Sequence, residues 1–212
     1  MSELAPHAVI HNARLAECKA LRQQIRHARR ALSDAEQQQA AAAASTRLLQ
    51  WIDAHNAASQ NHPIKHVALY FSCDGELNTA PLFAALWQRG IKTYLPVLHP
   101  FSHGQLLFLH YHQHSQMQRN RYGIPEPKLD IRQLLLPQQL DIIITPLVAF
   151  DDHGNRMGMG GGFYDRTLAN PQVTATALGY AHECQHSEHI PLAPWDVPLP
   201  LIVTPTRLID NR

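Results

Sequence analysis

The feature that most constrains how this chain can fold is a short apolar run, residues 140–145 (LDIIIT), which leads toward a glycine-rich loop. A strand this apolar is buried on both faces, as strands are in a parallel sheet that helices cover on two sides. The chain has 212 residues, of which 45% are hydrophobic. It is therefore long enough to enclose such a sheet in one sizeable α/β domain.

Periodic patterns predict two helices in the first quarter of the chain. Apolar residues recur at every third or fourth position over residues 15–32, which predicts a first helix that starts at Asn12. Ser33 and Glu36 form a predicted capping box. This box opens a second helix, which we expect to run through an alanine-rich stretch to about His55.

Strand patterns follow, and helices separate them. The predicted strands cover residues 65–72, 91–98, 106–112, 140–145, 173–181 and 201–204. A helix capped by Thr79 is predicted over residues 80–89, and a short helix over about 164–169. Strands that alternate with helices imply a mostly parallel sheet between helical layers. The predicted organisation is a single catalytic domain over residues 12–212, preceded by a loose tail over residues 1–11.

Composition narrows the class of protein. The formal net charge is +1, so no overall field favours nucleic acid or a membrane as partner. The three cysteines form no CxxC pair, so neither a zinc knuckle nor a disulfide scaffold is indicated. This use of cysteine fits a protein of a reducing compartment. There is no secretory signal pattern, and no apolar run approaches the roughly 20 residues that span a bilayer. We therefore expect a cytoplasmic protein without nucleic-acid or membrane partners.

The strongest chemical signal is the segment 155–166 (NRMGMGGGFYDR), which follows the apolar strand. Its four glycines let backbone N–H groups approach a phosphate, and the next helix points its positive end at the same place. Arg156 and Arg166 can add positive charge, and Asp165 can hold a Mg²⁺ ion that bridges phosphates. The segment lacks the GK[ST] of a Walker A loop and the spacing of the dinucleotide fingerprint. The plain alternative is a tight strand-to-helix turn with no ligand.

Two further segments carry candidate binding residues. Lys19 and Arg22 lie on the basic face of the first predicted helix and could reach nucleotide phosphates, although a solvated charged face is the alternative. Phe71 and Glu76 come at the end of the predicted strand 65–72 and in the loop after it. An aromatic ring there could stack on a heterocycle, and a carboxylate could accept its hydrogen bonds. The alternative for Glu76 is an exposed loop carboxylate.

These segments together resemble the 5-formyltetrahydrofolate cyclo-ligase family, also called the 5,10-methenyltetrahydrofolate synthetases. Residues 146–166 (PLVAFDDHGNRMGMGGGFYDR) are similar to the family's hallmark loop, which is highly specific. Other matches follow in the family's order, namely KALRQQIRHARRAL, ALYFSCDGELNT, TYLPVL, YGIPEP and WDVPLPLIVT. The resemblance covers nearly the whole chain from about Lys19 to Thr204.

The resemblance implies a fold and a reaction. The implied fold is a three-layer α/β/α domain with a mostly parallel sheet, of the kind shared by ribose-5-phosphate isomerases and CoA transferases. The implied reaction is the ATP-dependent cyclisation of 5-formyltetrahydrofolate to 5,10-methenyltetrahydrofolate, with release of ADP and phosphate, through an N5-iminium phosphate intermediate. Mg²⁺ is the implied cofactor, ATP is the co-substrate, and we expect the chain to act as a monomer on these small molecules.

Site residues follow from the matched positions. The implied ATP-binding residues are Lys19, Arg22, Arg156, Met157, Gly158, Met159, Gly160, Gly161, Gly162, Phe163 and Tyr164. The implied folate-binding residues are Phe71, Glu76, Met159, Gly160, Gly161, Gly162 and Phe163. The implied Mg²⁺ ligands are Asp165 and Asp196. Cys18 stands where many members have a basic residue, so the choice between Lys19 and Arg22 as the ATP contact stays open.

Two rival classes of function stay open at this point. Another enzyme on the same scaffold, such as a sugar-phosphate isomerase or a CoA transferase, would need a catalytic carboxylate and no ATP. A nucleotide-binding or RNA-associated regulator without activity would rest on the basic first helix alone, and the net charge of +1 argues against it.

Overall fold

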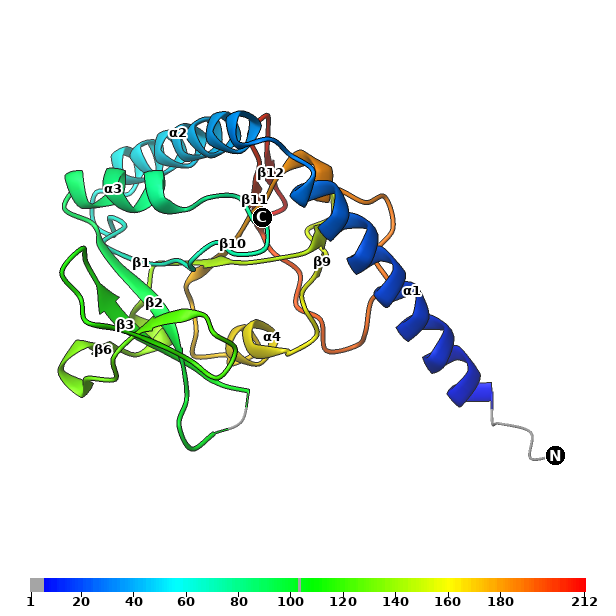
Figure 1. Cartoon of the computed structure of the whole chain (residues 1–212). Helices are drawn as coiled ribbons and strands as arrows, with labels where there is room; N and C mark the ends of the chain where they lie inside the picture. Colours follow the sequence, from blue (N-terminus) through cyan, green and yellow to red (C-terminus); the bar gives the residue numbers. More distant parts are fainter. Residues whose placement is uncertain (1–5, 103) are drawn as a thin grey trace.

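An eight-stranded sheet runs through the middle of the structure, a computed structural model that describes residues 6–102 and 104–212 (Figure 1). In spatial order its strands are β12 (Leu208–Asp210), β11 (Leu201–Val203), β10 (Thr176–Tyr180), β7 (Ile142–Thr145), β1 (His66–Ala68), β2 (Lys92–Leu98), β3 (Leu106–Tyr111) and β6 (Leu134–Leu135). The five strands from β11 to β2 are parallel, whereas β12, β3 and β6 are antiparallel to their neighbours. The predicted α/β class with a mostly parallel sheet is therefore confirmed.

The apolar strand that opened the sequence argument occupies the centre of the sheet. β7 lies between β10 and β1, and all four of its residues are fully buried. Ile142 and Ile144 belong to the core beneath α2 (Asp34–Ala58) and α3 (Ala80–Gln88). Ile143 points to the other face, into the core beside α4 (Phe163–Leu168). Helices thus cover both faces of the sheet, as the three-layer prediction requires (Figure 1).

The first helix covers an end of the sheet rather than a face. α1 (Pro6–Arg30) packs through Cys18 and Ile25 against Val148 and Met157, next to the carboxyl end of β7. The helix begins six residues before its predicted start at Asn12, and the division into a tail and a single catalytic domain stays a prediction. Residues 1–5 of that predicted tail lie outside the described part of the chain.

The second helix forms as its sequence signals predict. The Ser33 hydroxyl accepts a hydrogen bond from the backbone N–H of Glu36 at 3.3 Å, and the Glu36 carboxylate accepts one from the backbone of Ser33 at 2.7 Å. This reciprocal capping box satisfies N–H groups that a helix start leaves open. The buried stripe of α2 faces the sheet and contains Ala41, Ala44, Ser45, Leu48, Leu49 and Ile52.

The predicted side-chain cap of α3 is wrong. Thr79 occupies the cap position, but its hydroxyl donates to the backbone carbonyl of Tyr70 at 2.8 Å. The Asn78 carboxamide oxygen instead accepts from the backbone N–H of Ala80 at 2.9 Å. Because the Thr79 hydroxyl bonds to Tyr70, it fixes the loop after β1. The strand β1 itself ends at Ala68 and is shorter than the predicted strand 65–72.

Several short elements were not predicted. Two-stranded hairpins are formed by β4 (Met117–Arg119) with β5 (Pro125–Pro127) and by β8 (Ala149–Phe150) with β9 (Arg156–Met157). The strand predicted over 201–204 is followed by a further strand, β12. Single 3-10 turns complete the connections as η1 (Ile131–Gln133), η2 (Pro137–Gln139) and η3 (Glu183–Gln185).

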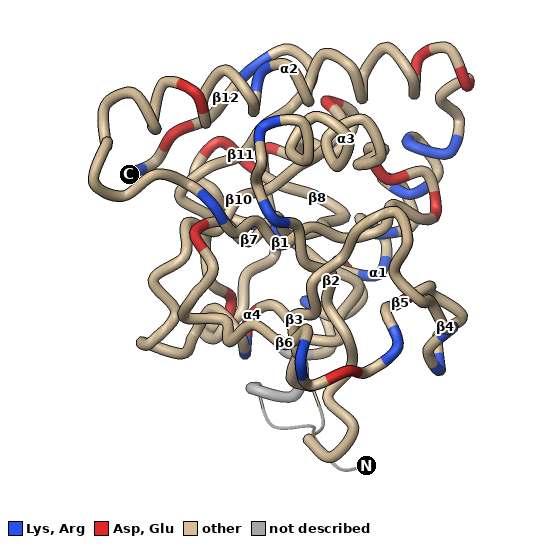
Figure 2. Tube along the Cα trace, turned by 90° about the vertical axis from the view of Figure 1, so that its left-hand side faces the viewer, with Lys and Arg blue, Asp and Glu red and all other residues tan. Residues whose placement is uncertain are grey.

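Charged residues are spread over the molecule. Figure 2 shows Lys and Arg positions on several elements, interspersed with Asp and Glu. No helix within residues 6–102 and 104–212 is long and apolar enough to cross a membrane.

The tight turn between β8 and β9 gives a first prediction, about stability. Gly154 has a φ of +82°, and a Cβ added there would overlap the carbonyl oxygen of Leu199. We expect Gly154→Ala to lower stability by about 3 kcal/mol, because the left-handed strain of roughly 1–2 kcal/mol adds to a backbone clash that cannot relax cheaply. For a chain of this size that is a fall in Tm of roughly 6–12 °C in a thermal melt.

The matched control is Gly123→Ala. Gly123 has a similar φ of +76°, but a Cβ there would meet no atom within 4 Å. Only the strain term applies, so its Tm should fall by just a few degrees. Equal losses in the two variants would contradict the clash at Leu199.

Candidate active site

The loops that carry the predicted site residues meet at the carboxyl ends of β1, β7 and β10. α1 crosses this edge, where the Arg29 guanidinium donates to the backbone carbonyls of Asp74 at 2.8 Å and Leu147 at 3.4 Å. The loop near the C-terminus joins them through Val197, whose N–H donates to the Asp165 carboxylate at 3.4 Å. Ligands of open α/β sheets bind outside the carboxyl ends of the strands, which is where these segments converge.

The glycine-rich loop, residues 158–162, connects β9 to α4 and is largely open to solvent. Gly160 and Gly162 have φ values of +92° and +65°, which other residues rarely adopt. A Cβ added at Gly158 would meet no atom within 4 Å. Arg22 donates from Nε to the carbonyl of Gly158 at 2.8 Å, so α1 places a guanidinium beside the loop. Exposed backbone next to a fixed cation is the environment that an anion requires.

Arg156 is a buried cation with unused hydrogen-bond donors. The residue is 5% exposed, and its Nη1 donates to the Asp165 carboxylate at 2.7 Å. Its Nε and Nη2 atoms are buried without a hydrogen-bond partner among the described residues. Burial lowers the pKa of Arg156, while the nearby carboxylates of Asp165 and Asp196 act in the opposite direction. Unpaired buried N–H groups are costly, so a ligand oxygen that accepts from them would bind strongly here.

The two predicted metal ligands, Asp165 and Asp196, are both close enough for their charges to act on Arg156. Asp165 uses Oδ1 to accept from Arg156 and Val197, and its side chain is 21% exposed. Asp196 uses Oδ2 to accept from the backbone N–H of Ala193 at 2.8 Å. Each carboxylate has a second oxygen with no hydrogen bond to any described residue.

Glu76 is a largely buried carboxylate in the loop after β1. Its side chain is 9% exposed, its Oε2 accepts from the backbone N–H of Cys73 at 3.1 Å, and its Oε1 lies 3.8 Å from Arg29 Nη1. Burial raises the pKa of Glu76, while the Cys73 bond and the Arg29 charge lower it. The alternative of an exposed loop carboxylate is therefore wrong. Tyr164 lies near both Glu76 and Arg156, whose charges both act on its pKa, which burial raises.

Comparison with known proteins decides the family. Residues 14–205 match the sequence profile of the 5-formyltetrahydrofolate cyclo-ligase family. The chain is 50% identical over 188 residues to the 5-formyltetrahydrofolate cyclo-ligase of Escherichia coli strain K12, and the matched region covers 87% of this chain and 98% of that protein. The chain belongs to the 5-formyltetrahydrofolate cyclo-ligase family. The cyclo-ligase of Haemophilus influenzae is 46% identical over 180 residues, covering 84% of this chain and 92% of its own length.

Solved structures agree with this membership. The 5,10-methenyltetrahydrofolate synthetase of Aquifex aeolicus superposes with a TM-score of 0.75 at 28% identity, covering 92% of this chain and 93% of its own. The synthetase of Mycoplasma pneumoniae gives a TM-score of 0.69 at 26% identity, covering 89% of this chain and 98% of its own. Cyclo-ligase membership favours the predicted enzyme over the two rival classes. The likeness to ribose-5-phosphate isomerases and CoA transferases stays a prediction.

Three residues of this cyclo-ligase do not lie as the sequence suggests. Arg166 is held by the backbone of the loops, since it donates to the carbonyls of Gly104 at 2.8 Å and of Gly161. Met157 alternates with Arg156 on β9, and its side chain packs in the core with Cys18 and Ile25 of α1. Lys19 is exposed and forms no hydrogen bond or ion pair with the described residues, whereas Arg22 contacts the loop.

Aromatic side chains line the outer part of the cyclo-ligase site. Phe163 packs against Gly161, and its ring centroid lies 6.4 Å from that of Tyr122 in an edge-on arrangement. Tyr122 was not predicted individually, although the YGIPEP match contains it. Met159 is 58% exposed at the tip of the loop. Phe71 is half-buried against Tyr111 and Phe83, at centroid distances of 5.2 and 5.8 Å. Phe71 packs against the core beneath α2 and α3, whereas Phe163 packs against the core that contains Ile143, so the two predicted aromatic contacts belong to different clusters.

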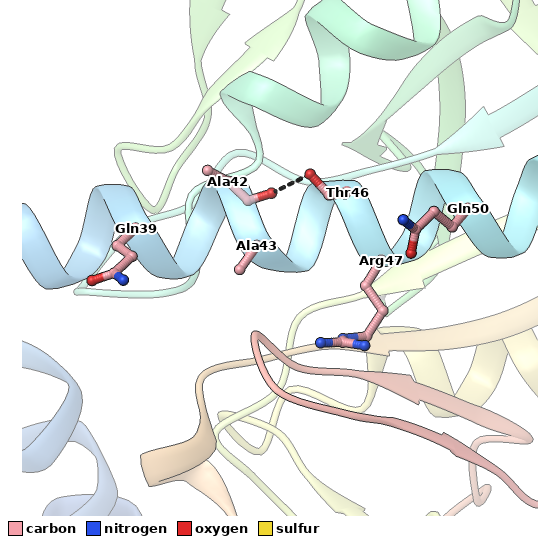
Figure 3. Close-up of a pocket in the computed structure, with 6 residues that line it drawn as sticks. All are labelled: Gln39, Ala42, Ala43, Thr46, Arg47 and Gln50. Atoms are coloured by element: carbon pink, nitrogen blue, oxygen red, sulfur yellow. Dashed lines mark hydrogen bonds between the residues drawn. The ribbon is translucent and has the colours of Figure 1, made fainter.

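A separate depression lies along α2. It has a volume of about 520 Å³ and is lined by Gln39, Ala42, Ala43, Thr46, Arg47 and Gln50 (Figure 3). The Thr46 hydroxyl donates to the Ala42 carbonyl at 3.0 Å within the helix, and Arg47 donates to the carbonyl of Pro205. None of the predicted site residues lines this depression, so it is not part of the cyclo-ligase site.

Proposed function

We propose that this chain uses ATP to cyclise 5-formyltetrahydrofolate to 5,10-methenyltetrahydrofolate, with release of ADP and phosphate. The observation that carries the proposal is the buried Arg156, which has two N–H-bearing nitrogens without a partner among the described residues and stands two residues before the open glycine-rich loop. Tyr164 lies close enough to both Arg156 and Glu76 for their charges to act on its pKa, which places the two charged groups in one region. Such a site can hold a triphosphate and a polar heterocycle next to each other.

The chemistry explains why these two sides must meet. A formyl amide oxygen is a poor leaving group, so the oxygen attacks the γ-phosphorus of ATP and the bond to the ADP oxygen breaks. The resulting N5-iminium phosphate has an electrophilic carbon, which N10 attacks. N10 loses its proton, the carbon–oxygen bond breaks, and phosphate leaves as the ring closes. The protein needs to align the reactants and stabilise negative charge on phosphoryl oxygens, and no protein nucleophile is required.

The phosphate side consists of cations and backbone N–H groups. Arg156 donates from a fixed, buried position, and Arg22 contributes charge from α1. We propose that ATP is bound by Lys19, Arg22, Arg156, Gly158, Met159, Gly160, Gly161, Gly162, Phe163 and Tyr164, with only backbone groups contributing at Met157. Of the two α1 candidates, Arg22 is favoured as the triphosphate contact because it already touches the loop.

Asp165 and Asp196 are the proposed ligands of Mg²⁺. The described residues contain no group of three or more His, Cys, Asp or Glu side chains suited to a metal. Mg²⁺ in phosphoryl-transfer sites takes only one or two carboxylates, together with phosphate oxygens and waters, so two aspartates that each have a free carboxylate oxygen fit it. When bound, Mg²⁺ neutralises charge on the phosphate oxygens.

The folate side consists of aromatic surface and one carboxylate. Phe71 and Glu76 would hold the pterin, since a carboxylate accepts hydrogen bonds from its N–H groups and a ring packs on its face. The loop residues Met159, Gly160, Gly161, Gly162 and Phe163 would line the path between pterin and triphosphate. Support for Glu76 comes from its burial beside Tyr164, which an unused surface carboxylate would not show.

One assay tests the proposed function. Purified protein is mixed with 5-formyltetrahydrofolate, ATP and Mg²⁺, and the near-ultraviolet absorbance of the methenyl product is followed. We expect product to form in proportion to ADP, and to depend on ATP and on Mg²⁺. No product in the presence of all components would contradict the proposal. The same preparation run through size-exclusion chromatography with light scattering tests the expected monomer, which we propose acts in the cytoplasm.

The metal assignment gives a second prediction. We expect Asp165→Asn to lower kcat about a hundredfold and to raise the Mg²⁺ concentration that gives half-maximal rate, because one ligand charge beside the phosphates is lost. Titrating Mg²⁺ at saturating ATP measures both effects. Asp130→Asn is the control, since Asp130 pairs only with the exposed Arg132. An unchanged Mg²⁺ requirement in Asp165→Asn would remove Asp165 from this role.

A further inference from the structure

Arg29 is the most deeply buried charge of α1, and it connects that helix to two loops of the site. The residue is 1% exposed. Its Nε donates to the carbonyl of Asp74 and its Nη2 to the Asp74 carboxylate, both at 2.8 Å. Its Nη1 reaches the carbonyl of Leu147 at 3.4 Å and lies 3.8 Å from Oε1 of Glu76. One guanidinium therefore fixes the loop after β1 and the segment after β7 relative to each other.

The charge of Asp74 alone does not explain why Arg29 is buried, because two other arginines already pair with Asp74. Arg26 donates to its carboxylate at 2.7 Å, and Arg30 pairs with it as well. These two side chains are 33% and 54% exposed, so they neutralise Asp74 from the solvent side. Burial alone would raise the pKa of Asp74, but these three arginines lower it to about 2. Arg29 differs from the other two because it also reaches Glu76.

Glu76 has a single cation among the groups that act on its charge. From its own loop it faces Cys73 and Asp74, and the phenols of Tyr70 and Tyr164 approach from the end of β1 and from α4. Arg29, from α1, is the positively charged member of this set. Burial favours the protonated form of Glu76, and the charge of Arg29 opposes it.

His182 is a further titratable neighbour of Arg29, and it carries no charge, whereas burial raises the pKa of the neighbouring Cys184 thiol. His182 is 2% exposed, and burial followed by the charge of Arg29 lowers its pKa to about 4. At neutral pH this imidazole is therefore uncharged. It neither neutralises Glu76 nor competes with Arg29 for the Glu76 carboxylate.

We propose that Arg29 is a positioning residue for the reaction, because its buried guanidinium, 3.8 Å from Oε1 of Glu76, holds that carboxylate in place for the pterin of the folate substrate. The proposal rests on the proposed function, in which Glu76 accepts hydrogen bonds from the pterin N–H groups. A protonated Glu76 would lose acceptor capacity and could not hold those donors equally well. Arg29 would thus act on folate binding from behind the site without touching the substrate.

The first arm of the test does not depend on turnover. The pKa of Glu76 is measured by NMR titration of glutamate carboxyl groups in the full chain, with Glu76→Gln identifying its resonance. We expect Arg29→Gln to raise this pKa by about one unit or more, because the cation that opposes burial is gone. Arg30→Gln is the matched control, since it removes another partner of Asp74 and leaves Glu76 untouched. Arg29→Lys keeps the positive charge, so the pKa of Glu76 in this variant should lie close to its wild-type value.

The second arm reads the consequence for catalysis. In Arg29→Gln the KM for 5-formyltetrahydrofolate should rise at least about tenfold, the size of one lost charge-assisted hydrogen bond, with the KM for ATP nearly unchanged. Because a raised pKa leaves Glu76 protonated at higher pH, the acid limb of kcat/KM for folate should move to higher pH. Combining Arg29→Gln with Glu76→Gln should add little to the effect of Glu76→Gln alone.

The outcomes separate this inference from the proposed function. A Glu76 pKa that is the same in wild type and Arg29→Gln overturns the inference, whatever the enzyme does. Equal losses in Arg29→Gln and Arg30→Gln, or equal rises in both KM values, also overturn it, because they indicate general loosening of α1. Failure of the proposed function would instead appear as absence of methenyl product from the wild-type chain, while the NMR arm still reports on Arg29.

Discussion

Replacing Arg156 by methionine is expected to lower kcat/KM for ATP about a thousandfold without lowering Tm. The first effect follows from the site, because a buried guanidinium aimed at transferring phosphoryl oxygens contributes at least this much in comparable reactions. The second follows from packing. The Nε and Nη2 atoms of Arg156 are buried without partners, and each such group destabilises the fold by roughly 1–3 kcal/mol. Methionine fills similar volume and carries no unpaired donor.

The combination of lost activity and retained stability is what distinguishes a functional arginine from a structural one. Steady-state kinetics and a thermal melt of the same preparation measure both quantities. Arg89→Met is the control, since Arg89 forms a half-exposed pair with Asp53 far from the loop and should keep wild-type kinetics. A large drop in Tm for Arg156→Met would indicate that its pair with Asp165 holds the fold, and would count against an anion site.

The centre of the fold was predictable because its signals are local. Apolar residues at 142–144 can only be buried, and β7 is buried on both faces. The capping box at Ser33 satisfies donors within its own helix turn, so no distant partner was needed to predict it. Thr79 shows the opposite case, because its hydroxyl has a long-range partner in Tyr70 that no local pattern reveals. The early start of α1 at Pro6 was missed because residues 6–11 show no clear apolar period that would indicate a helix.

The sequence predicted which segments form the candidate site, but not what each arginine in these segments contacts. Sequence spacing places an arginine on each side of the glycines, and both looked equally able to bind phosphate. The structure gives the two arginines different environments. The short strand β9 buries Arg156 next to Asp165, whereas Arg166 donates to the loop backbone. In the same way Arg29 looked like one more member of a basic helix face. Its burial depends on Asp74, 45 positions away, and such contacts are set by tertiary packing rather than by the helix period.

The glycine-rich loop carries the last prediction, which is that Gly160→Val weakens ATP binding about a hundredfold. Gly160 has a φ of +92°, which a β-branched residue avoids, so valine would rotate the backbone and turn N–H groups away from the phosphate space. Losing two hydrogen bonds to a charged ligand accounts for an effect of this size. The site is exposed, and an added Cβ would lie 3.6 Å from Arg22, so the fold itself has room for the substitution.

Calorimetric titration with ADP or ATP measures the affinity, and Gly90→Val provides a control with the same backbone strain. Gly90 has a φ of +71° and no atom within 4 Å of an added Cβ, and it lies after α3, outside the proposed site. Both variants should therefore lose similar stability, while only Gly160→Val should lose nucleotide affinity. If the two variants bound ATP equally well, the substitution at Gly160 would have no effect on ATP beyond the backbone strain that both variants share. The loop would then be a turn rather than a phosphate-binding loop.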